Sequence, residues 1–366
     1  MSRHDHGLIL AGGRGTRFWP RSRKRTAKQV LNVVGKRSLI QATVDRLAPV
    51  IPPERLWVLT NHYLRETIVA QLPEIPARQI LAEPAQRNTA PAIGLAAHIL
   101  QSLDPEAVMG VFPSDHVIGK PAGYRAVLKA AFRAAREGHL TVVGIHPRWP
   151  ETGYGYVEFP RGSAPGAAQA LLVRRFHEKP ELPKARRYLA AGNFYWNSGM
   201  FFWRASVLLD QLRLHLPKTA TLLASLPAFG SRAFAARLAD AFPRCDNISI
   251  DYAVLEKATR GGGVSAPGVR GIAAADFGWN DVGSWNAVYE LRARDDRGNV
   301  IAAESIALDS GNNFVDAQGK TVALVGVHDL IVVDTPDALL VASRDSAQKV
   351  GEIVKLLEKR HRTDLL

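Results

Sequence analysis

The sequence contains a single cysteine, Cys245, among its 366 residues. A disulfide within the chain is therefore excluded, and such cysteine usage is typical of a reducing compartment. No apolar run approaches the roughly 20 residues that a membrane-spanning helix needs. The first residues are polar and lead directly into a strand-like run, unlike a signal peptide. We therefore expect a cytoplasmic protein with no membrane partner.

The sequence also lacks the patterns that bind metal clusters or nucleic acid. Its eleven histidines show no spacing typical of metal ligands. The formal net charge of +13 favours acidic partners, but the basic residues form no stripe with stacking aromatic residues between them. We therefore expect no nucleic-acid partner and assign the charge to small phosphorylated ligands. Of two basic clusters, we expect residues 21–28 to serve the glycine-rich turn described below, and we interpret residues 359–362 as a solvated face.

Apolar residues make up 46% of the chain, enough for one large or two smaller domains. Strand-like and helix-like segments alternate through the first half, which is typical of an α/β fold with a Rossmann-like, mostly parallel mixed sheet and helices on both faces. Ligands of such sheets bind at the carboxyl ends of the strands. The expected strands are 8–11, 56–60, 108–112 and 140–145, and the expected helices are 38–47 with Ser38 as N-cap, 89–103 capped by Asn88 or Thr89, and 122–137.

The composition changes near Asp295, where we place a boundary between domains 1–295 and 296–366. Short apolar runs separated by turn residues fill residues 299–345, which favours a small β unit such as a solenoid or half-barrel. A final helix is expected at 345–360. In the middle of the chain we expect strands at 154–159, 171–177 and 194–203, helices at 181–191, 205–214 and 232–241, and a loop at 260–263.

A glycine-rich turn directly after the first strand is the feature most informative about function. The apolar run ends at Ala11, the turn Gly12-Gly13-Arg14-Gly15-Thr16-Arg17 follows, and Lys28 comes shortly afterwards. Glycines let backbone N–H groups approach an anion closely, and the cationic side chains neutralise it. We therefore expect a polyphosphate ligand at this turn.

This turn differs from two better-known phosphate loops. A dinucleotide fingerprint would need glycine where Phe18 stands. A Walker A loop needs serine or threonine after Gly35-Lys36, and the chain has Arg37 there. The sequence therefore predicts a third kind of nucleotide loop.

The turn and further segments resemble the signature of sugar-1-phosphate nucleotidyltransferases, most closely of those that use GTP and mannose 1-phosphate. Each segment alone is weak evidence, but their ordered series over roughly residues 7 to 295 is specific. The resemblance implies the fold of nucleotide-diphospho-sugar transferases, with a short left-handed β-helix after it. The segments that follow the turn are Glu83-Pro84, Arg87-Asn88-Thr89-Ala90-Pro91-Ala92, Phe112-Pro113-Ser114-Asp115-His116, Gly153-Tyr154-Gly155-Tyr156, Glu178-Lys179-Pro180, Tyr195-Trp196-Asn197-Ser198-Gly199-Met200, Ser249-Ile250-Asp251-Tyr252 and Gly278-Trp279-Asn280-Asp281-Val282-Gly283-Ser284-Trp285.

The resemblance implies a reaction in which GTP and mannose 1-phosphate give GDP-mannose and diphosphate, with Mg²⁺ held by Asp115 and Asp281. From the residues alone, each aspartate could equally well be a metal ligand or a residue that caps a turn or helix. The attacking oxygen belongs to a phosphate whose second pKa is about 6, so no general base is needed. We expect catalysis by positioning and charge neutralisation, without a covalent intermediate. By the same resemblance, Lys179 would hold the attacking group, and Arg17 and Lys28 would steady the departing diphosphate.

The resemblance further assigns residues to the two substrates, and a homodimer is expected by analogy with the family. One departure from the family pattern is Ala27, where proline usually precedes the first lysine. The implied nucleotide-binding residues are Ala11, Gly12, Gly13, Gly15, Thr16, Arg87, Asn88 and Thr89, and the implied sugar-binding residues are Gly155, Glu178 and Asn197.

Three other interpretations compete with this one. A sister enzyme could use the same core with another base or sugar. A non-catalytic nucleotide-sugar sensor should have lost metal or phosphate ligands, but all four charged residues are present, namely Lys28, Asp115, Lys179 and Asp281. A nucleic-acid-binding protein would need the basic and aromatic stripe that the sequence lacks.

Overall fold

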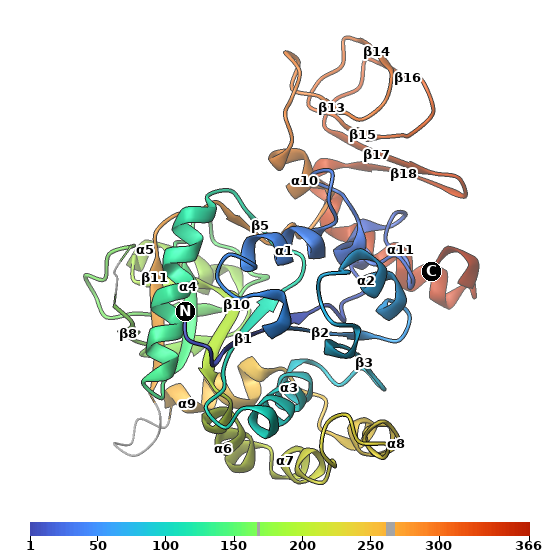
Figure 1. The fold of residues 1–366 in the computed structure, drawn as a ribbon. Coiled ribbons are helices and arrows are strands. Elements are labelled where there is room, and N and C mark those ends of the chain that lie inside the picture. Colours follow the sequence, from blue (N-terminus) through green and yellow to red (C-terminus); the bar gives the residue numbers. More distant parts are fainter. Residues whose placement is uncertain (167–168, 261–267) are drawn as a thin grey trace.

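The computed structural model describes residues 1–166, 169–260 and 268–366, except for the side chain of Arg260. A ten-stranded sheet forms the centre of the first 295 residues, in the order β3-β2-β1-β4-β10-β6-β11-β8, with β7 paired to β10 and β9 paired to β7 (Figure 1). A short pair, β5 and β12, lies outside it. The strands are β1 (Asp5–Leu10), β2 (Leu56–Asn61), β3 (Ile80–Glu83), β4 (Val108–Pro113), β5 (Val117–Ile118), β6 (Leu140–Ile145), β7 (Tyr156–Glu158), β8 (Leu171–Leu172), β9 (Arg175–His177), β10 (Phe194–Arg204), β11 (Val269–Ala274) and β12 (Trp279–Asn280).

The predicted mostly parallel mixed sheet is confirmed. Strand β1 pairs in parallel with both β2 and β4, and β2 pairs in parallel with β3. The long strand β10 runs antiparallel between β4 and β6, and β6 pairs in parallel with β11. Because β1 and β4 run side by side, their carboxyl ends bring the glycine-rich turn and the loop that holds Asp115 to one edge of the sheet.

Helices cover both faces of the sheet, because successive strand residues point to opposite sides. Leu8 and Leu59 belong to one apolar cluster, whereas Ile9 and Val58 belong to the other. The first cluster is covered by α3 (Thr89–Leu103), α6 (Ala205–His215), α7 (Pro217–Ala224) and α8 (Phe234–Ala241), and the second by α1 (Leu39–Leu47), α2 (Arg65–Gln71), α4 (Pro121–Arg136) and α5 (Leu182–Ala191). The other helices of this part are α9 (Glu256–Arg260) and α10 (Trp285–Leu291).

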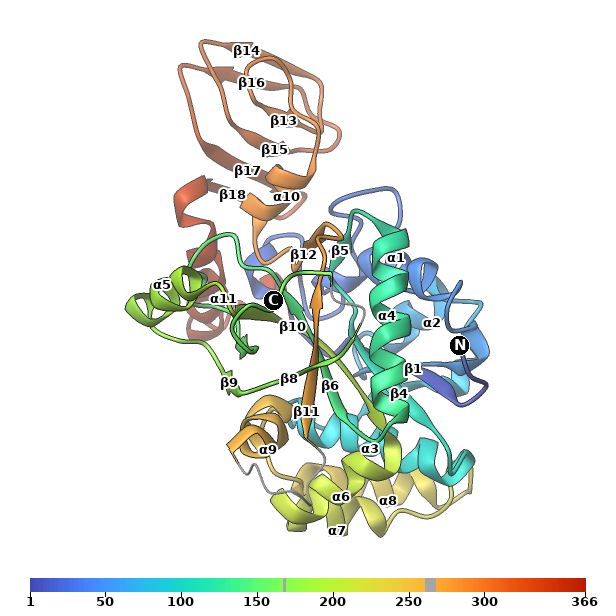
Figure 2. The same cartoon turned by 90° about the vertical axis from the view of Figure 1, so that its left-hand side faces the viewer.

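Short strands stacked in parallel form a separate body beyond one end of the sheet (Figure 2). Strand β13 pairs with β15, β15 with β17 and β14 with β16, all in parallel, and β18 closes the stack as an antiparallel partner of β17. This β-helix-like unit agrees with the small β unit expected from the sequence. Its strands are β13 (Val300–Ile301), β14 (Ser305–Leu308), β15 (Phe314–Asp316), β16 (Val322–Val325), β17 (Leu330–Thr335) and β18 (Ala338–Ser343).

Helix boundaries follow local chemistry where a cap is present. The Ser38 side chain accepts a hydrogen bond from the backbone N–H of Gln41 and Gln41 reaches back, a capping box that begins α1 as predicted. Asn88, one of the two predicted caps, accepts a hydrogen bond from the backbone N–H of Thr89 at the start of α3. Gly192 ends α5 in the left-handed conformation, with φ of 72°.

Two predicted elements are wrong in detail. Residues 171–177 are not one strand, because Val173 hydrogen-bonds to Val269 whereas Arg174 hydrogen-bonds to Glu158, so the segment changes partner between β8 and β9. The final helix is also divided. A 3-10 helix, η7 (Arg344–Lys349), precedes α11 (Val350–Lys359). The predicted loop at 260–263 lies, from residue 261 on, outside the described residues.

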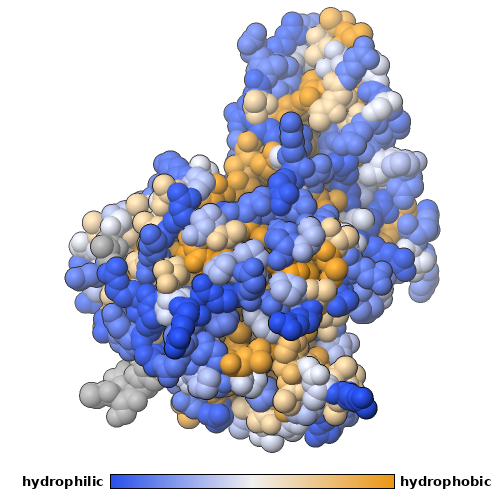
Figure 3. Space-filling model, viewed as in Figure 1, coloured by the Kyte–Doolittle hydropathy of each residue, from blue (hydrophilic) through white to orange (hydrophobic). Residues whose placement is uncertain are grey.

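No helix in the described part of the chain is long and apolar enough to cross a membrane. The surface seen in Figure 3 is mainly hydrophilic, with apolar side chains gathered in part on the β-helix-like unit. Exposed large apolar residues of that unit are Ile306, Leu308, Val325, Leu339 and Val341. The homodimer stays a prediction.

Candidate active site

The glycine-rich turn is tied down through its carbonyl groups. Gln29 Nε2 donates hydrogen bonds to the carbonyl oxygens of Ala11, at 2.6 Å, and Gly13, at 3.0 Å. Thr60 Oγ1 donates a second hydrogen bond to the Ala11 carbonyl, at 3.0 Å. Within the described residues, no acceptor takes the N–H groups of Gly12 or Gly13. The turn therefore has fixed carbonyls and free N–H groups, an arrangement suited to an anion.

Gly15 brings Lys28 against this turn. Its φ of 59° lies in the left-handed region that favours glycine, and a Cβ atom there would lie only 2.5 Å from Cβ of Lys28. A larger residue at position 15 would push the lysine away. The turn and Lys28 therefore form one packed unit.

The Lys28 ammonium group joins the two predicted metal ligands. Its Nζ donates hydrogen bonds to Asp115 Oδ2 at 2.8 Å and to the backbone carbonyl of Asp281 at 2.7 Å. The side chain of Lys28 is only 7% exposed, whereas that of Asp115 is 33% exposed. Burial alone raises the pKa of the Asp115 carboxyl, but the nearby charges of Lys28 and His116, with the hydrogen bond from Lys28, together hold it below its usual value. Asp115 and Asp281, 166 residues apart in sequence, thus share one partner.

Asp281 faces the same space as Arg17. A Cβ atom on Gly283 would lie 2.9 Å from Asp281 Oδ2 and 3.5 Å from Arg17 NH1, so the absence of a side chain lets both groups come close. Burial, and then the charge of Asp281 and a hydrogen bond to it, raise the pKa of the Tyr154 hydroxyl. Asp281 therefore accepts a hydrogen bond from the Tyr154 hydroxyl and lies near the Arg17 guanidinium group, with no ion pair between Arg17 and Asp281 among the described residues.

A cavity of about 350 Å³ adjoins Asp281 and contains all three residues predicted to bind the sugar, namely Gly155, Glu178 and Asn197. The Gly155 carbonyl accepts a 2.7 Å hydrogen bond from the Asn197 backbone N–H. A Cβ atom on Gly155 would lie 2.5 Å from Glu178 Oε2, so only glycine lets that carboxylate approach the backbone. Lys179 also lines this cavity, and its Nζ lies 3.3 Å from Glu178 Oε1.

Asp251 is a further acidic residue of this cavity. Its Oδ1 accepts a 3.0 Å hydrogen bond from Asn197 Nδ2, while Asn197 Oδ1 accepts one of 3.2 Å from the Gly199 backbone N–H. Both ends of the Asn197 amide are therefore fixed. Burial, and then the charge of Glu178, raise the pKa of Asp251 to about 7.

Local backbone irregularities aim these groups into the cavity. Asp251 begins a π-helical turn, Asp251–Leu255, and such turns are frequent at functional sites. The register of β10 shifts between Asn197 and Phe201, where it pairs with β6. An irregularity of this kind redirects a side chain at the edge of an active site.

A second cavity, of about 200 Å³, is lined by Glu83 and Asn61, together with Arg14 of the turn and Lys24. Burial raises the pKa of the Glu83 carboxyl to about 8. The described residues provide no ion pair to this carboxylate. Such a half-buried and unpaired acid is costly for the fold and is typical of a site that receives a ligand.

The three residues at the start of α3 have different surroundings. Thr89 lines the cavity of Asn197, and its Oγ1 accepts a 2.9 Å hydrogen bond from the Ile250 backbone N–H. Asn88 caps the helix, because its side-chain Oδ1 accepts a hydrogen bond from the backbone N–H of Thr89. Arg87 contributes to neither cavity, and its Nε is buried without a hydrogen-bond partner among the described residues.

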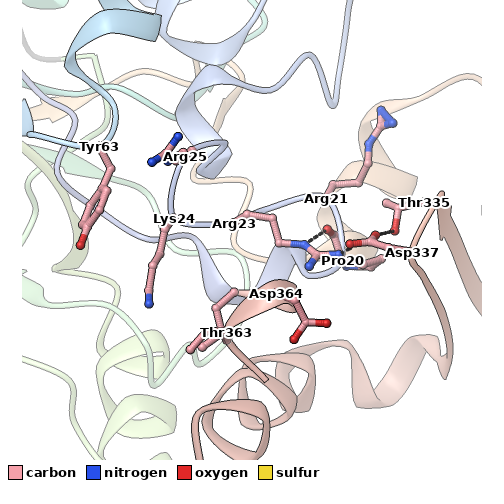
Figure 4. A pocket seen from close by; sticks show the side chains of 11 residues that line it. Pro20, Arg21, Arg23, Lys24, Arg25, Tyr63, Thr335, Asp337, Thr363 and Asp364 are labelled. Atoms are coloured by element: carbon pink, nitrogen blue, oxygen red, sulfur yellow. Dashed lines mark hydrogen bonds and ion pairs between the residues drawn. The ribbon is translucent and has the colours of Figure 1, made fainter. Parts of the chain in front are cut away.

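The sequence predicted that the basic cluster at residues 21–28 serves the glycine-rich turn. The structure shows that only part of the cluster does so. Arg21 and Arg23 form ion pairs with Asp316, at 3.4 Å, and Asp337, at 3.0 Å, in the β-helix-like unit. Figure 4 shows the Arg23 side chain pointing toward Pro20 and Asp337, in a groove of about 490 Å³ where the two parts of the chain meet. Arg21 and Arg23 therefore join the two parts of the molecule. Among the described residues of the cluster, Lys28 is the one that binds Asp115 and Asp281.

The sequence pointed to some of these residues without giving them a role. Glu83 and Asp251 both lie in segments of the resemblance, but only the structure reveals that each is a half-buried acid that lines a cavity. No pattern in the sequence could identify Gln348, which belongs to η7 and lines a cavity with Arg17 and Asp281.

Family models and known relatives agree with this fold and site. The model of the nucleotidyl transferase family matches residues 6–297. A second model, described as the MannoseP isomerase/GMP-like β-helix domain, matches residues 303–357. The chain therefore belongs to the nucleotidyl transferase family. Members of this family generally use a divalent metal.

Within that family, the chain is similar to proteins of one kind. It is 40% identical to the xanthan biosynthesis protein XanB of Xanthomonas campestris and 37% identical to the mannose-1-phosphate guanylyltransferase of Escherichia coli, in both cases over 98% of this chain and 74% of the relative. A solved structure described as mannose-1-phosphate geranyltransferase from Thermus thermophilus is 33% identical, with a TM-score of 0.82 over 97% of this chain and 99% of that one.

Proposed function

We propose that the protein transfers the GMP group of GTP to mannose 1-phosphate and releases diphosphate. A phosphate oxygen of the sugar phosphate attacks the α-phosphorus of GTP. The new bond gives GDP-mannose, while the bond to the bridging oxygen breaks and the diphosphate takes its electron pair. The observation that carries this proposal is the single ammonium group of Lys28, which hydrogen-bonds to both Asp115 and Asp281 beside the glycine-rich turn. The names of the relatives support the choice of substrates.

The central difficulty of this reaction is that two anions must meet. In our proposal, the N–H groups of Gly12 and Gly13 and the side chains of Arg17 and Lys28 bind the triphosphate. Lys179 binds the phosphate of the sugar and holds the attacking oxygen in line. Fixed cations and N–H groups of this kind stabilise the charge in the transition state without reorganising. No general base enters the mechanism, because the attacking phosphate is largely dianionic at neutral pH.

Mg²⁺ is the divalent metal that we propose, on Asp115 and Asp281. The donors fit, because Mg²⁺ is usually held by one or two carboxylates together with substrate phosphates. Among the described residues, no group of three or more histidine, cysteine or acidic side chains forms a metal site, so the remaining ligands would come from phosphates and water. When bound, the ion neutralises charge on the phosphates that must approach each other.

We assign mannose to the cavity of Glu178, Asn197 and Asp251, and guanine to the cavity of Glu83. Carboxylates accept hydrogen bonds from sugar hydroxyls, and a fixed amide adds a directional partner. Guanine presents an N1–H and a 2-amino group side by side, and the ionised Glu83 carboxylate can accept from both, so guanine binding favours the ionised form and lowers the raised pKa. Adenine presents an acceptor at N1 and would leave the carboxylate unsatisfied. The unpaired Glu83 carboxyl in this cavity supports the choice of guanine.

A substrate panel tests the proposal directly. Diphosphate release is measured with each of the four ribonucleoside triphosphates and dTTP, against mannose 1-phosphate and glucose 1-phosphate, and products are identified by mass. We expect GTP with mannose 1-phosphate to give the highest kcat/KM. Preference for another pair would assign a sister activity to this site. Release of no diphosphate with any pair would show that the protein is not a transferase of this class.

A further inference from the structure

The C-terminal segment lies directly against the glycine-rich turn. A Cβ atom on Gly351, at the start of α11, would lie 3.3 Å from Thr16 Oγ1 and 3.4 Å from Cγ of Arg17, so the helix begins in close contact with the turn. The buried Trp19 Nε1 donates a 3.1 Å hydrogen bond to the carbonyl of Leu365. A single apolar cluster includes Phe18 and Trp19 as well as Val350 and Val354. The turn is therefore packed on both the sheet and the C-terminal segment.

The two arginines of the turn bind this segment in chemically different ways. Arg14 NH1 lies 2.7 Å from Glu358 Oε1, so a carboxylate neutralises its charge. Arg17 NH1 donates a 2.6 Å hydrogen bond to Oε1 of Gln348, a neutral amide. A guanidinium group has five N–H donors. The amide therefore orients Arg17 while its charge and its other donors stay available.

Gln348 also has a place in the active site itself. It lines a cavity of about 610 Å³ together with Arg17, Asp281 and Gly283. The cavity shares Gly153, Tyr154, Trp279 and Asp281 with the one assigned to the sugar. The amide of Gln348 therefore faces the space in which the phosphates of our proposed reaction would react.

We propose that Gln348 is a positioning residue for phosphate release: its amide holds the Arg17 guanidinium toward the departing diphosphate without neutralising it. This inference depends on the proposed function only in requiring that diphosphate leaves beside Arg17. By this inference the C-terminal segment contributes a residue to the active site, in addition to supporting the turn by packing against it. It also explains why the chain places a neutral acceptor on Arg17 and an acidic one on Arg14.

The competing explanation is that the hydrogen bond merely fastens two segments together. Two substitutions separate these explanations. Gln348→Ala removes the acceptor, so Arg17 loses its orientation. Gln348→Glu keeps an acceptor at the same distance along the side chain and strengthens the link, but its carboxylate neutralises Arg17. A fastening role would be preserved by glutamate, whereas a positioning role would not.

The test measures the reverse reaction with the full-length protein, at saturating nucleotide sugar and constant excess Mg²⁺. We expect KM for diphosphate to rise about fivefold in Gln348→Ala, the size typical of the net contribution of one hydrogen bond at an exposed position. In Gln348→Glu we expect a rise of at least about tenfold, with a melting temperature no lower than that of the wild type. KM for the nucleotide sugar should change less than twofold in both variants.

Glu358→Gln provides the matched control. It removes an ion pair between the same two segments but leaves the Arg17 contact intact, so KM for diphosphate should not rise. The proposal is overturned if Gln348→Glu has wild-type KM for diphosphate, or if Glu358→Gln raises it as much as Gln348→Ala does. Diphosphate is the product with any triphosphate, so the measurement uses whichever substrate pair is active in the wild type. A failed choice of GTP or mannose would therefore not be mistaken for a failure of this inference.

Discussion

Lys28 and Asp115 form a 2.8 Å ion pair across 87 residues of sequence. The lysine comes from the segment after the glycine-rich turn, and the aspartate from the loop that follows β4. The same ammonium group binds the carbonyl of Asp281. Because Lys28 is nearly buried and Asp115 is a third exposed, the lysine fixes one side of the carboxylate and leaves the other side open to a ligand. This arrangement brings both acids of the proposed metal site to one cation.

Replacing Asp281 by asparagine should remove most of the activity without unfolding the protein. The substitution keeps the backbone carbonyl that binds Lys28 but removes a charged oxygen from the proposed metal site. We expect kcat to fall by about 10²–10³-fold, as for the loss of one preorganised electrostatic contact. Steady-state kinetics and a thermal melt would measure both properties. Asp296→Asn, at an exposed position, should change neither, and near-normal turnover of Asp281→Asn would contradict the assignment.

Replacing Lys179 by alanine should separate activity from stability. Its side chain is 61% exposed, and exposed ion pairs contribute at most about 1 kcal/mol to stability. The melting temperature should therefore change little. We expect kcat to fall about 10²-fold, while KM for GTP changes much less, because Lys179 is proposed to hold the sugar phosphate. Lys129→Ala, also at an exposed position, is the control. A rise in KM for GTP as large as the fall in kcat would contradict the assignment, because it would show that Lys179 binds GTP and not the sugar phosphate.

The Glu83 carboxyl should make the free protein less stable as the pH rises. Burial raises its pKa from 4.5 to about 8 in the folded protein. Between these values the folded state binds more protons than the unfolded state, so the free energy of unfolding decreases with pH, by up to roughly 1.4 kcal/mol per unit. Glu83→Gln removes this dependence. Urea unfolding at pH 5.5, 7 and 8.5 should show the variant gaining stability over the wild type as the pH rises. A constant difference would contradict the raised pKa.

The same substitution tests how the base is chosen. Glutamine presents an N–H donor to the N–H groups of guanine, so Glu83→Gln should lower kcat/KM for GTP by about 10–100-fold, the range for a hydrogen bond to a charged group. Inosine triphosphate lacks the 2-amino group. The wild type should therefore prefer GTP to inosine triphosphate clearly, and the variant should lose much of that preference. An unchanged preference would show that other groups read the base.

Sequence and structure agree best where local signals are strong. The α3 helix and the β6 strand have the predicted bounds, because an asparagine cap and a short apolar run define them in isolation. The sequence also supplied the residues around Lys28 through family resemblance. It could not supply their geometry, because Lys28, Asp115 and Asp281 meet only through the order of the strands in the sheet.

The roles of several other residues could not be predicted from local sequence patterns, because these roles depend on distant partners or on burial. Arg21 and Arg23 appear in the sequence as neighbours of the phosphate loop, yet their partners are aspartates about 300 residues away in the β-helix-like unit. Gln348 looks like an ordinary exposed residue of a terminal helix. Glu83 and Asp251 are recognisable as acids, but their raised pKa values depend on burial, which the sequence does not report.

Asp251 should make binding of the sugar phosphate depend on pH near neutrality. Its pKa is raised to about 7, by burial and then by the charge of Glu178. The ionised carboxylate accepts hydrogen bonds from sugar hydroxyls and from Asn197. Protonation below pH 7 removes an acceptor, so KM for mannose 1-phosphate should fall as the pH rises from 6 to 8.

The substrate phosphate also titrates, with a pKa of about 6, and Asp251→Asn separates the two effects. The variant should have a KM at least about tenfold higher at pH 8, the cost of losing a hydrogen bond to a charged group, and should keep only the dependence due to the substrate. Its melting temperature at pH 8 should not fall, because a half-buried carboxylate with a raised pKa is replaced by a neutral amide. Identical KM–pH profiles for the two proteins would show that Asp251 does not contact the sugar. A profile centred near 7 in the wild type alone would assign the titration to this carboxyl.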